Sequence, residues 1–205
     1  MPSAVNDSQV MTEMDIRTKY RELLRSLREG NSTQSVTNLR PWHCAAAVSE
    51  LMAFACDSQK AIKASSNGHA TVRILTGSCP QHVYGKDAME PTRQFVLDGG
   101  QVRVLVYNDS IDTTQNSLYS LGRQFPQTVQ WRLSRTNVDG DKLSHFFVVN
   151  AAAFRLEAPH RKLSGENFTD CEPKIPARIC FNDPETANQL VKFFDGLWEC
   201  CAPVQ

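Results

Sequence analysis

The sequence predicts an α/β domain in which a mixed sheet is flanked by helices, with a helical extension at the N-terminus. Between residues 71 and 133, strand-like apolar runs alternate with amphipathic segments, a pattern typical of parallel strands joined by helices. After residue 142, strand-like runs follow one another without long helices between them. A separate amphipathic segment precedes residue 30, and the 205 residues suffice for one domain with such an addition.

The first 37 residues are predicted to lie outside the main domain. Residues 1–10 are expected to be disordered, residues 11–37 to form an amphipathic helix and a polar linker, and residues 38–201 to form the α/β domain. Thr12 suits the N-cap of this helix and Gly30 its end. Its apolar side chains recur at helical spacing: Ile16, Tyr20, Leu23, Leu24 and Leu27. They need a partner surface, which is either another subunit or protein, or the chain's own domain.

The first half of the domain reads as alternating helices and strands. "RPWHCAAAVSELMAFACDSQKAIKASSNGH" predicts a long helix with Pro41 in its first turn. The strand "TVRILTG" is followed by the helix "DAMEPTRQFVLDGG", in which Pro91 predicts a late start or a break. The strand "QVRVLVYN", the helix "TTQNSLYSLGRQFP" and the strand "VQWRLS" come next. Such alternation predicts a parallel core sheet with right-handed crossovers.

The second half is predicted to add antiparallel strands and a closing helix. The strands are "KLSHFFVVNA", "AAFRLEAP" and "PARICFN", and the first two form a hairpin that turns at residues 150–152. In "DPETANQLVKFFDGLWECC", Asp183 suits the N-cap and Pro184 the first turn. The apolar stripe of this last helix predicts that it docks on the sheet.

Composition narrows the function classes. Lys plus Arg and Asp plus Glu both number 22, so no long-range field attracts nucleic acid or anionic lipid, although this leaves room for a local basic patch. The start lacks the pattern of a signal peptide, and no window approaches about eighteen uninterrupted apolar residues, which predicts a cytoplasmic protein. The seven cysteines include no CxxC pair, which favours reduced thiols; no metal and no cofactor are expected.

The order of predicted elements, ending in "FFDGLW", resembles one half of the phospholipase D superfamily over residues 40–199. That superfamily also includes nucleases and non-catalytic regulators. In its active members one strand carries a histidine, a lysine two residues on and an aspartate five residues further. On "LSHFFVVN" this pattern places Leu143 at the nucleophilic histidine, His145 at the lysine and Asn150 at the aspartate.

A shifted alignment does not restore the motif. If His145 takes the position of the family histidine, Phe147 falls on the lysine and Ala152 on the aspartate. Phosphoryl transfer needs an attacking imidazole, a cation that stabilises the phosphoryl oxygens and an orienting carboxylate. The resemblance also implies two motifs, from two repeats or a dimer, and this chain has length for one. It therefore predicts a non-catalytic binding or regulatory module that acts through a homodimer or a partner protein, with the N-terminal helix as the docking element.

Four residues remain candidates for a site on the hairpin: His145, Asn150, Arg155 and Glu157. By alternation His145 shares a face with Leu143 and Phe147, while Arg155 and Glu157 share a face of the neighbouring strand. Arg155 and Glu157 form either a plain ion pair or an anion or sugar pocket. The alternative function is a divergent phosphodiesterase or nuclease in which His145 acts with Arg155 and Glu157.

The loop "LTGSCPQHVYG" is a second candidate region, because ligands of parallel sheets bind beyond the strand carboxyl ends. Thr76 and Ser78 could bind an anion together with Arg155, or could be ordinary turn residues. Asp109 and Asp112 are interpreted as helix-capping residues in preference to metal ligands. A nucleic-acid-binding accessory protein is a further alternative, which the zero net charge disfavours.

Overall fold

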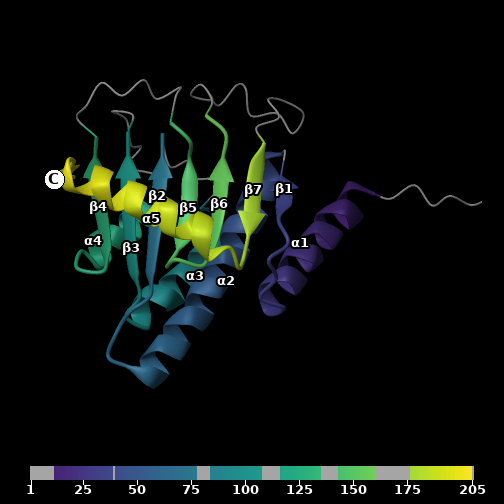
Figure 1. The fold of residues 1–205 in the computed structure, drawn as a ribbon, viewed down its shortest axis with the longest axis horizontal. Coiled ribbons are helices and arrows are strands. Elements are labelled where there is room, and N and C mark those ends of the chain that lie inside the picture. The colour runs from purple at the N-terminus through teal and green to yellow at the C-terminus, as the bar shows by residue number, and fades with distance from the viewer. Residues whose placement is uncertain are drawn as a thin grey trace, which may run out of the picture.

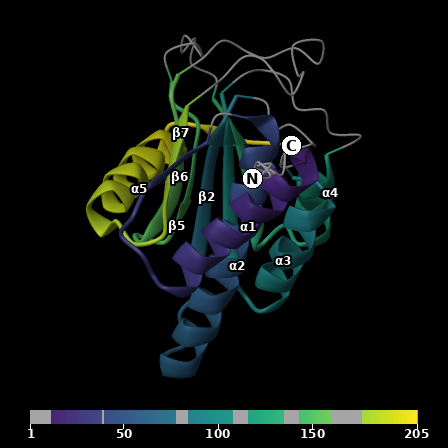
Figure 2. The ribbon, with the colours of Figure 1, turned by 90° about the vertical axis from the view of Figure 1, so that its right-hand side faces the viewer.

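The computed structural model describes residues 12–38, 40–77, 84–107, 116–134, 143–159 and 176–204. In these residues an eight-stranded mixed sheet, in the order β1-β7-β6-β5-β2-β3-β4-β8, lies between two helical layers (Figures 1 and 2). Helices α1 to α4 cover one face and α5 covers the other. The predicted α/β class and mixed sheet are confirmed. The predicted disorder of residues 1–10 falls outside the described residues.

The parallel part of the sheet is formed by β2, β3 and β4, and every other neighbouring pair is antiparallel. The hairpin of β5 and β6 turns where the sequence predicted. The strands are β1 (Val36–Asn38), β2 (Thr71–Thr76), β3 (Gln101–Val106), β4 (Val129–Leu133), β5 (Phe146–Val149), β6 (Ala153–Glu157), β7 (Ala177–Cys180) and β8 (Ala202–Pro203).

The helix ends follow the predicted capping residues. The Thr12 hydroxyl accepts a hydrogen bond from the Asp15 backbone N–H, and the Asp183 carboxylate accepts one from Thr186. Thr12 and Asp183 therefore cap the first and last helices as expected. The helices are α1 (Glu13–Glu29), α2 (Pro41–Ser65), α3 (Lys86–Leu97), α4 (Ser117–Gln124) and α5 (Pro184–Glu199).

Helix α3 runs through Pro91, so the predicted late start or break is wrong. Proline has no N–H to donate to the Asp87 carbonyl one turn earlier. The hydroxyl of Ser49, on α2, donates to that carbonyl instead, at 3.0 Å. The Pro91 carbonyl in turn accepts from the Cys56 thiol at 3.3 Å. The side chain of Ser49 thus satisfies the carbonyl that the proline leaves without its usual partner.

Helix α1 packs on α2 of its own domain. Leu24 and Leu27 are buried, and Arg28 pairs with Glu50 at 2.9 Å and with Asp57 at 2.6 Å. Of the two expectations for this helix, docking on the chain's own surface is the arrangement found. Three large apolar side chains of α1 nevertheless remain exposed: Met14, Ile16 and Leu23.

The segment predicted as a polar linker contributes a strand. Residues 36–38 form β1 and pair with β7 at the edge of the sheet, so β1 spans the predicted boundary between residues 37 and 38. Asn38 is 1% exposed and therefore belongs to the interior. A three-residue strand carries too little alternation to be recognised, because its stability comes from pairing with a strand that is distant in sequence.

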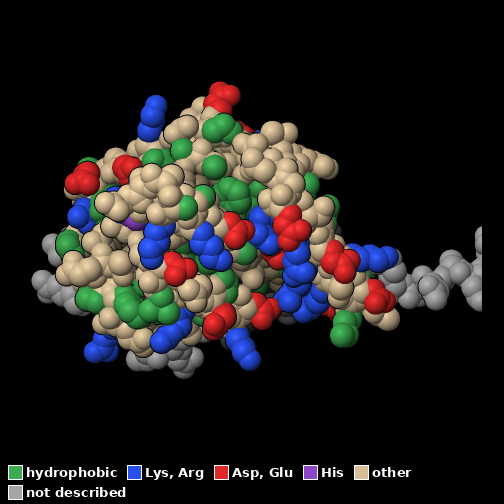
Figure 3. All heavy atoms as spheres, turned by 90° about the horizontal axis from the view of Figure 1, so that it is seen from below, with side chains coloured by type: hydrophobic (Ala, Val, Ile, Leu, Met, Phe, Trp, Pro, Cys, Tyr) green, Lys and Arg blue, Asp and Glu red, His purple; other side chains and the backbone are tan. Residues whose placement is uncertain are grey.

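Two apolar clusters fill the space on either side of the sheet. Val72 and Ile74 face α2 and α3, whereas Leu75 faces α5, as the alternation of a strand requires. Seen from below, acidic and basic side chains interleave over the surface (Figure 3). Among the described helices, none combines the length and the apolar character that a membrane crossing would require.

Candidate functional site

Polar residues form a row across the α2 face of the sheet, at the end where β2 finishes and β5 begins. Asn38 pairs with Ala177, and Ala177 pairs with Glu157. The Glu157 backbone N–H donates to the His145 carbonyl at 2.8 Å, which continues the row onto the residue that precedes β5. The small side chain of Ala177 leaves room between Asn38 and Glu157. Thr76 ends β2 on the same face.

Three side chains of this row contact the side chain of Arg155 or one another. The Nη1 atom of Arg155 donates to Oε2 of Glu157 at 3.0 Å, and Nε of Arg155 donates to Oδ1 of Asn38 at 3.2 Å. The Nδ1 atom of His145 lies 3.6 Å from the same Oε2. The side chains of Arg155, Glu157 and His145 are only 6%, 14% and 17% exposed. We call this group the Arg155 cluster: Asn38, His145, Arg155 and Glu157.

The two charges of the cluster stabilise each other in the interior. Burial opposes ionisation of Glu157, but the nearby Arg155 guanidinium and the hydrogen bonds to the carboxylate hold its pKa well below the usual range. Burial likewise opposes the charge of Arg155, but the electrostatic interactions of the guanidinium with Cys44 and Glu157 outweigh burial and raise its pKa. Near neutral pH, where the Cys44 thiol is uncharged, Glu157 supplies the counter-charge. The arrangement is therefore a buried ion pair with an imidazole beside it.

The start of α2 and one residue of α1 lie next to the cluster. Burial raises the pKa of the Cys44 thiol to about 11, so Cys44 stays a neutral thiol. The rings of Tyr20 and His43 stack with centroids 4.2 Å apart. Burial, with the charge of Arg40, lowers the pKa of His43 to about 4. The Tyr20 hydroxyl is buried without a hydrogen-bond partner, and its pKa is raised by burial.

Leu143 does not share the face of His145. It packs with the apolar cluster under α5, and its carbonyl accepts from the Tyr107 hydroxyl at 3.3 Å. Phe147 belongs to the opposite cluster, on the α2 side. The alternation assumed from sequence fails here because β5 begins only at Phe146, after Leu143. The position that the resemblance assigns to the nucleophile is thus a partly buried leucine packed against an apolar core.

The other sequence candidates are separated. Asn150 lies in the hairpin turn with φ 50°, where its Oδ1 atom accepts from the Thr71 N–H at 2.8 Å. It therefore stands at the opposite end of β5 from His145. Thr76 is 7% exposed at the end of β2. Ser78 lies outside the described residues, as do Asp109 and Asp112.

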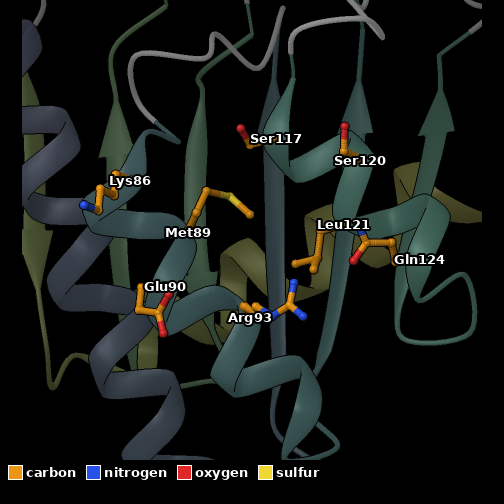
Figure 4. A pocket seen from close by; sticks show the side chains of 8 residues that line it. All are labelled: Lys86, Met89, Glu90, Arg93, Ser117, Ser120, Leu121 and Gln124. Carbon is orange, nitrogen blue, oxygen red and sulfur yellow. The ribbon is translucent and has the colours of Figure 1, made fainter.

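A groove with a volume of about 420 Å³ lies between α3 and α4, away from the Arg155 cluster (Figure 4). Met89 and Leu121 point toward each other across it. Its remaining lining is polar: Lys86, Glu90, Arg93, Ser117, Ser120 and Gln124. This lining holds no histidine or cysteine, and the part of the chain that is described contains no group of three or more His, Cys, Asp or Glu side chains placed to bind a metal.

Comparison with known proteins identifies the fold. No family model matches the chain, and no curated protein sequence matches it. Among solved structures it is similar to the phospholipase D family member Nuc from Salmonella typhimurium, with a TM-score of 0.52 and 14% identity over 84% of this chain and 98% of Nuc. NucT from Helicobacter pylori gives a TM-score of 0.56 and 13% identity over 83% and 99%. The chain has the phospholipase D-like fold.

A third structure similar to this chain is TrmBL2, described as an archaeal chromatin protein with a novel mode of DNA binding. Its TM-score is 0.50 at 10% identity, over 94% of this chain and 65% of TrmBL2. The resemblance inferred from sequence is thus confirmed at the level of the phospholipase D-like fold. Identities this low carry no site residue from these proteins to this chain.

Sequence reasoning proposed His145, Arg155 and Glu157, and the structure brings these three together. It missed Asn38, because β1 was assigned to the linker, and it missed Cys44 and Tyr20, which approach from helices. A signal for Asn38 was available only in the apolar and polar alternation of "SVTN", which is too short to predict a strand.

Proposed function

We propose that this chain is a non-catalytic phospholipase D-like module that acts by binding a partner protein or a second copy of itself. The observation that carries the proposal is the closed state of the Arg155 cluster. The Arg155 guanidinium donates to both Glu157 and Asn38, and the one carboxylate of the cluster faces both Arg155 and His145. A cation held in this way is committed to the fold and is poorly placed to stabilise phosphoryl oxygens.

The replaced nucleophile supports the same conclusion. Leu143 packs among apolar side chains under α5, and a hydrocarbon side chain cannot attack phosphorus. Asn150 supports the hairpin turn by accepting from Thr71. Two of the three positions that the family motif would occupy are therefore explained by packing and turn geometry alone.

A hydrolysis assay tests the absence of catalysis. The wild type and the variant His145→Ala are compared on bis(4-nitrophenyl) phosphate and on single-stranded and duplex DNA. We expect the same background rate from both proteins. Hydrolysis by the wild type that disappears in His145→Ala would refute the proposal. A thermal melt of the variant excludes loss of folding as the cause of any difference.

The binding surface that we propose is the side of α1 that carries Ile16 and Leu23, which share one face of the helix because they are two turns apart. They are 45% and 43% exposed, and neighbouring large apolar side chains at such exposure favour an interface. Light scattering after size exclusion is expected to give a dimer for the wild type and a monomer for Leu23→Glu. Leu97→Glu is the matched control, since Leu97 is 54% exposed on α3. A monomeric wild type would exclude a second copy of the chain as the occupant of this surface and would leave a different protein as the proposed partner.

One observation favours a second candidate, a divergent phosphodiesterase. The Nδ1 atom of His145 faces the Glu157 carboxylate at 3.6 Å, and a carboxylate at Nδ1 is how enzymes orient a reactive imidazole. In this alternative Arg155 would take the role of the absent lysine. The hydrolysis assay decides between the two, because only the phosphodiesterase requires His145 for turnover.

A further inference from the structure

Three arginines lie on the α5 face of the sheet, away from the Arg155 cluster. Arg73 of β2 is directly paired with Arg103 of β3, and Arg132 of β4 pairs with Leu105, two residues further along β3. Neighbouring strands are about 4.8 Å apart, so the three guanidinium groups extend from adjacent strands of one face. They form what we call the arginine patch: Arg73, Arg103 and Arg132.

Within the described part of the chain, one carboxylate pairs with this patch. Asp195 of α5 accepts from Nε and Nη2 of Arg73 at 2.9 and 3.1 Å, whereas its nearest atom is 3.8 Å from Nη1 of Arg103. Arg132 donates to the Trp198 carbonyl and lies over the Trp198 ring at 4.6 Å. Among the described residues in contact here, three positive charges face one negative charge, which leaves an excess of two.

Arg103 is the least committed of the three side chains. Its Nε atom is buried without a hydrogen-bond partner, and its guanidinium is 5.7 Å from the centre of the Trp198 ring. Its side chain is 31% exposed, against 14% for Arg73. Arg73 and Arg132 hold α5 on the sheet by hydrogen bonds, whereas Arg103 approaches Asp195 of α5 only to 3.8 Å and has the more exposed side chain, so its terminal nitrogens are the ones placed to donate to a ligand.

The surface around the patch is open and polar. Helix α5 crosses the strands and leaves their lower parts uncovered on this face (Figure 1). The side chains that share this part of the face are neutral hydrogen-bonding groups, and each is at least partly exposed: Thr71, Gln101 and Gln130. The patch is therefore a cationic sheet surface with neutral polar side chains beside it.

We propose that the arginine patch binds the phosphodiester backbone of a nucleic acid. Guanidinium groups match phosphate oxygens in geometry, and amide and hydroxyl side chains such as those beside the patch commonly contact the backbone. An open surface gives a small anion little enclosure, whereas a polyanion adds several weak contacts and releases counterions. The binding is independent of base sequence. It goes beyond the proposed function, because the patch lies on the other face of the sheet from the Arg155 cluster.

The test is fluorescence anisotropy of labelled oligothymidylate and of a labelled duplex, at about 50 mM and about 200 mM salt. We expect binding at the lower salt that weakens at the higher. Arg103→Gln should raise Kd by about two- to fivefold and reduce the slope of log K against log salt by about 0.7, the value for one lost contact with a single strand. Arg103→Lys, which keeps the charge, should retain most of the affinity.

The control variant is Arg93→Gln, which removes an exposed arginine of α3 on the opposite face. It should leave Kd unchanged, and Arg103→Gln should melt like the wild type because Arg73 still pairs with Asp195. Absence of binding to either probe, or an equal effect of the two variants, would overturn the proposal. Displacement by polyglutamate as effective as by unlabelled oligonucleotide would do the same, since it would assign the patch to acidic protein segments. None of these outcomes bears on hydrolysis or on oligomeric state.

Discussion

Replacing Glu157 by glutamine should destabilise the fold strongly, although the two side chains have nearly the same shape. The substitution removes the negative charge that lies 3.0 Å from Nη1 of Arg155. Arg155 would then remain charged with its side chain only 6% exposed. An uncompensated charge in the interior is costly because it has lost its hydration without gaining a counter-charge.

The size of the effect follows from the burial of the pair. Loss of one partner from a buried ion pair costs about 3–5 kcal/mol. Glu157 is itself 14% exposed, and Asn38 continues to accept from Arg155, so we expect the lower end, about 3 kcal/mol. For a chain of this size that corresponds to a Tm lower by about 6–12 °C.

Urea and thermal denaturation followed by circular dichroism measure this cost. Glu13→Gln is the matched control, because Glu13 pairs with Arg17 at 2.6 Å but the two side chains are 57% and 42% exposed. It should cost less than about 1 kcal/mol. The double variant Arg155→Met with Glu157→Gln should be more stable than Glu157→Gln alone, since it leaves no unpaired charge. If Glu157→Gln costs no more than Glu13→Gln, the pair is screened by solvent and the reasoning is wrong.

Three further predictions concern pH, packing and the hairpin turn. The pKa of Glu157 is lower in the folded than in the unfolded state, so its ionisation stabilises the fold fully above the unfolded pKa of about 4.3. This contribution is lost as the pH falls below that value. Urea melts below about pH 4 should therefore show a steeper loss of stability for the wild type than for Glu157→Gln. Gly100→Ala would push a methyl group into the buried ring of Phe95 and should cost about 1–3 kcal/mol in a urea melt. Asn150→Ala removes the acceptor of the Thr71 N–H at a positive φ, so a loss of about 1–3 kcal/mol is expected, and Asn150→Gly, which accommodates that φ, should lose less; equal losses would count against backbone strain.

The elements that sequence predicted well carry their own local signals. Thr12 and Gly30 bound the first helix, and Asp183 with Pro184 begins the last, because capping depends on residues within one turn. Pro91 misled for a complementary reason. The hydroxyl that donates to the Asp87 carbonyl, in place of the N–H that proline lacks, belongs to Ser49 on α2. No pattern within the α3 sequence indicates a partner on another helix.

The candidate site divides in the same way. Period-two alternation placed Arg155 and Glu157 on one face of β6, and their contact follows from that local rule. Asn38 completes the cluster from a strand 117 residues earlier in the chain, so only the tertiary pairing of β1 with β7 could reveal it. Leu143 was misplaced because alternation was extended beyond the start of β5.

The pairing of β1 with β7 also has a consequence for biosynthesis. Val36 is made long before Ile179, yet the two stand opposite each other in the sheet. While the ribosome adds the residues between them, β1 has no strand to pair with. Until β1 is in place, the Nε donor of Arg155 also lacks its acceptor, the side-chain oxygen of Asn38. Closure of this edge must therefore wait until β7 has been made, so a chain that stalls before β7 would expose an unpaired strand to aggregation and to chaperones.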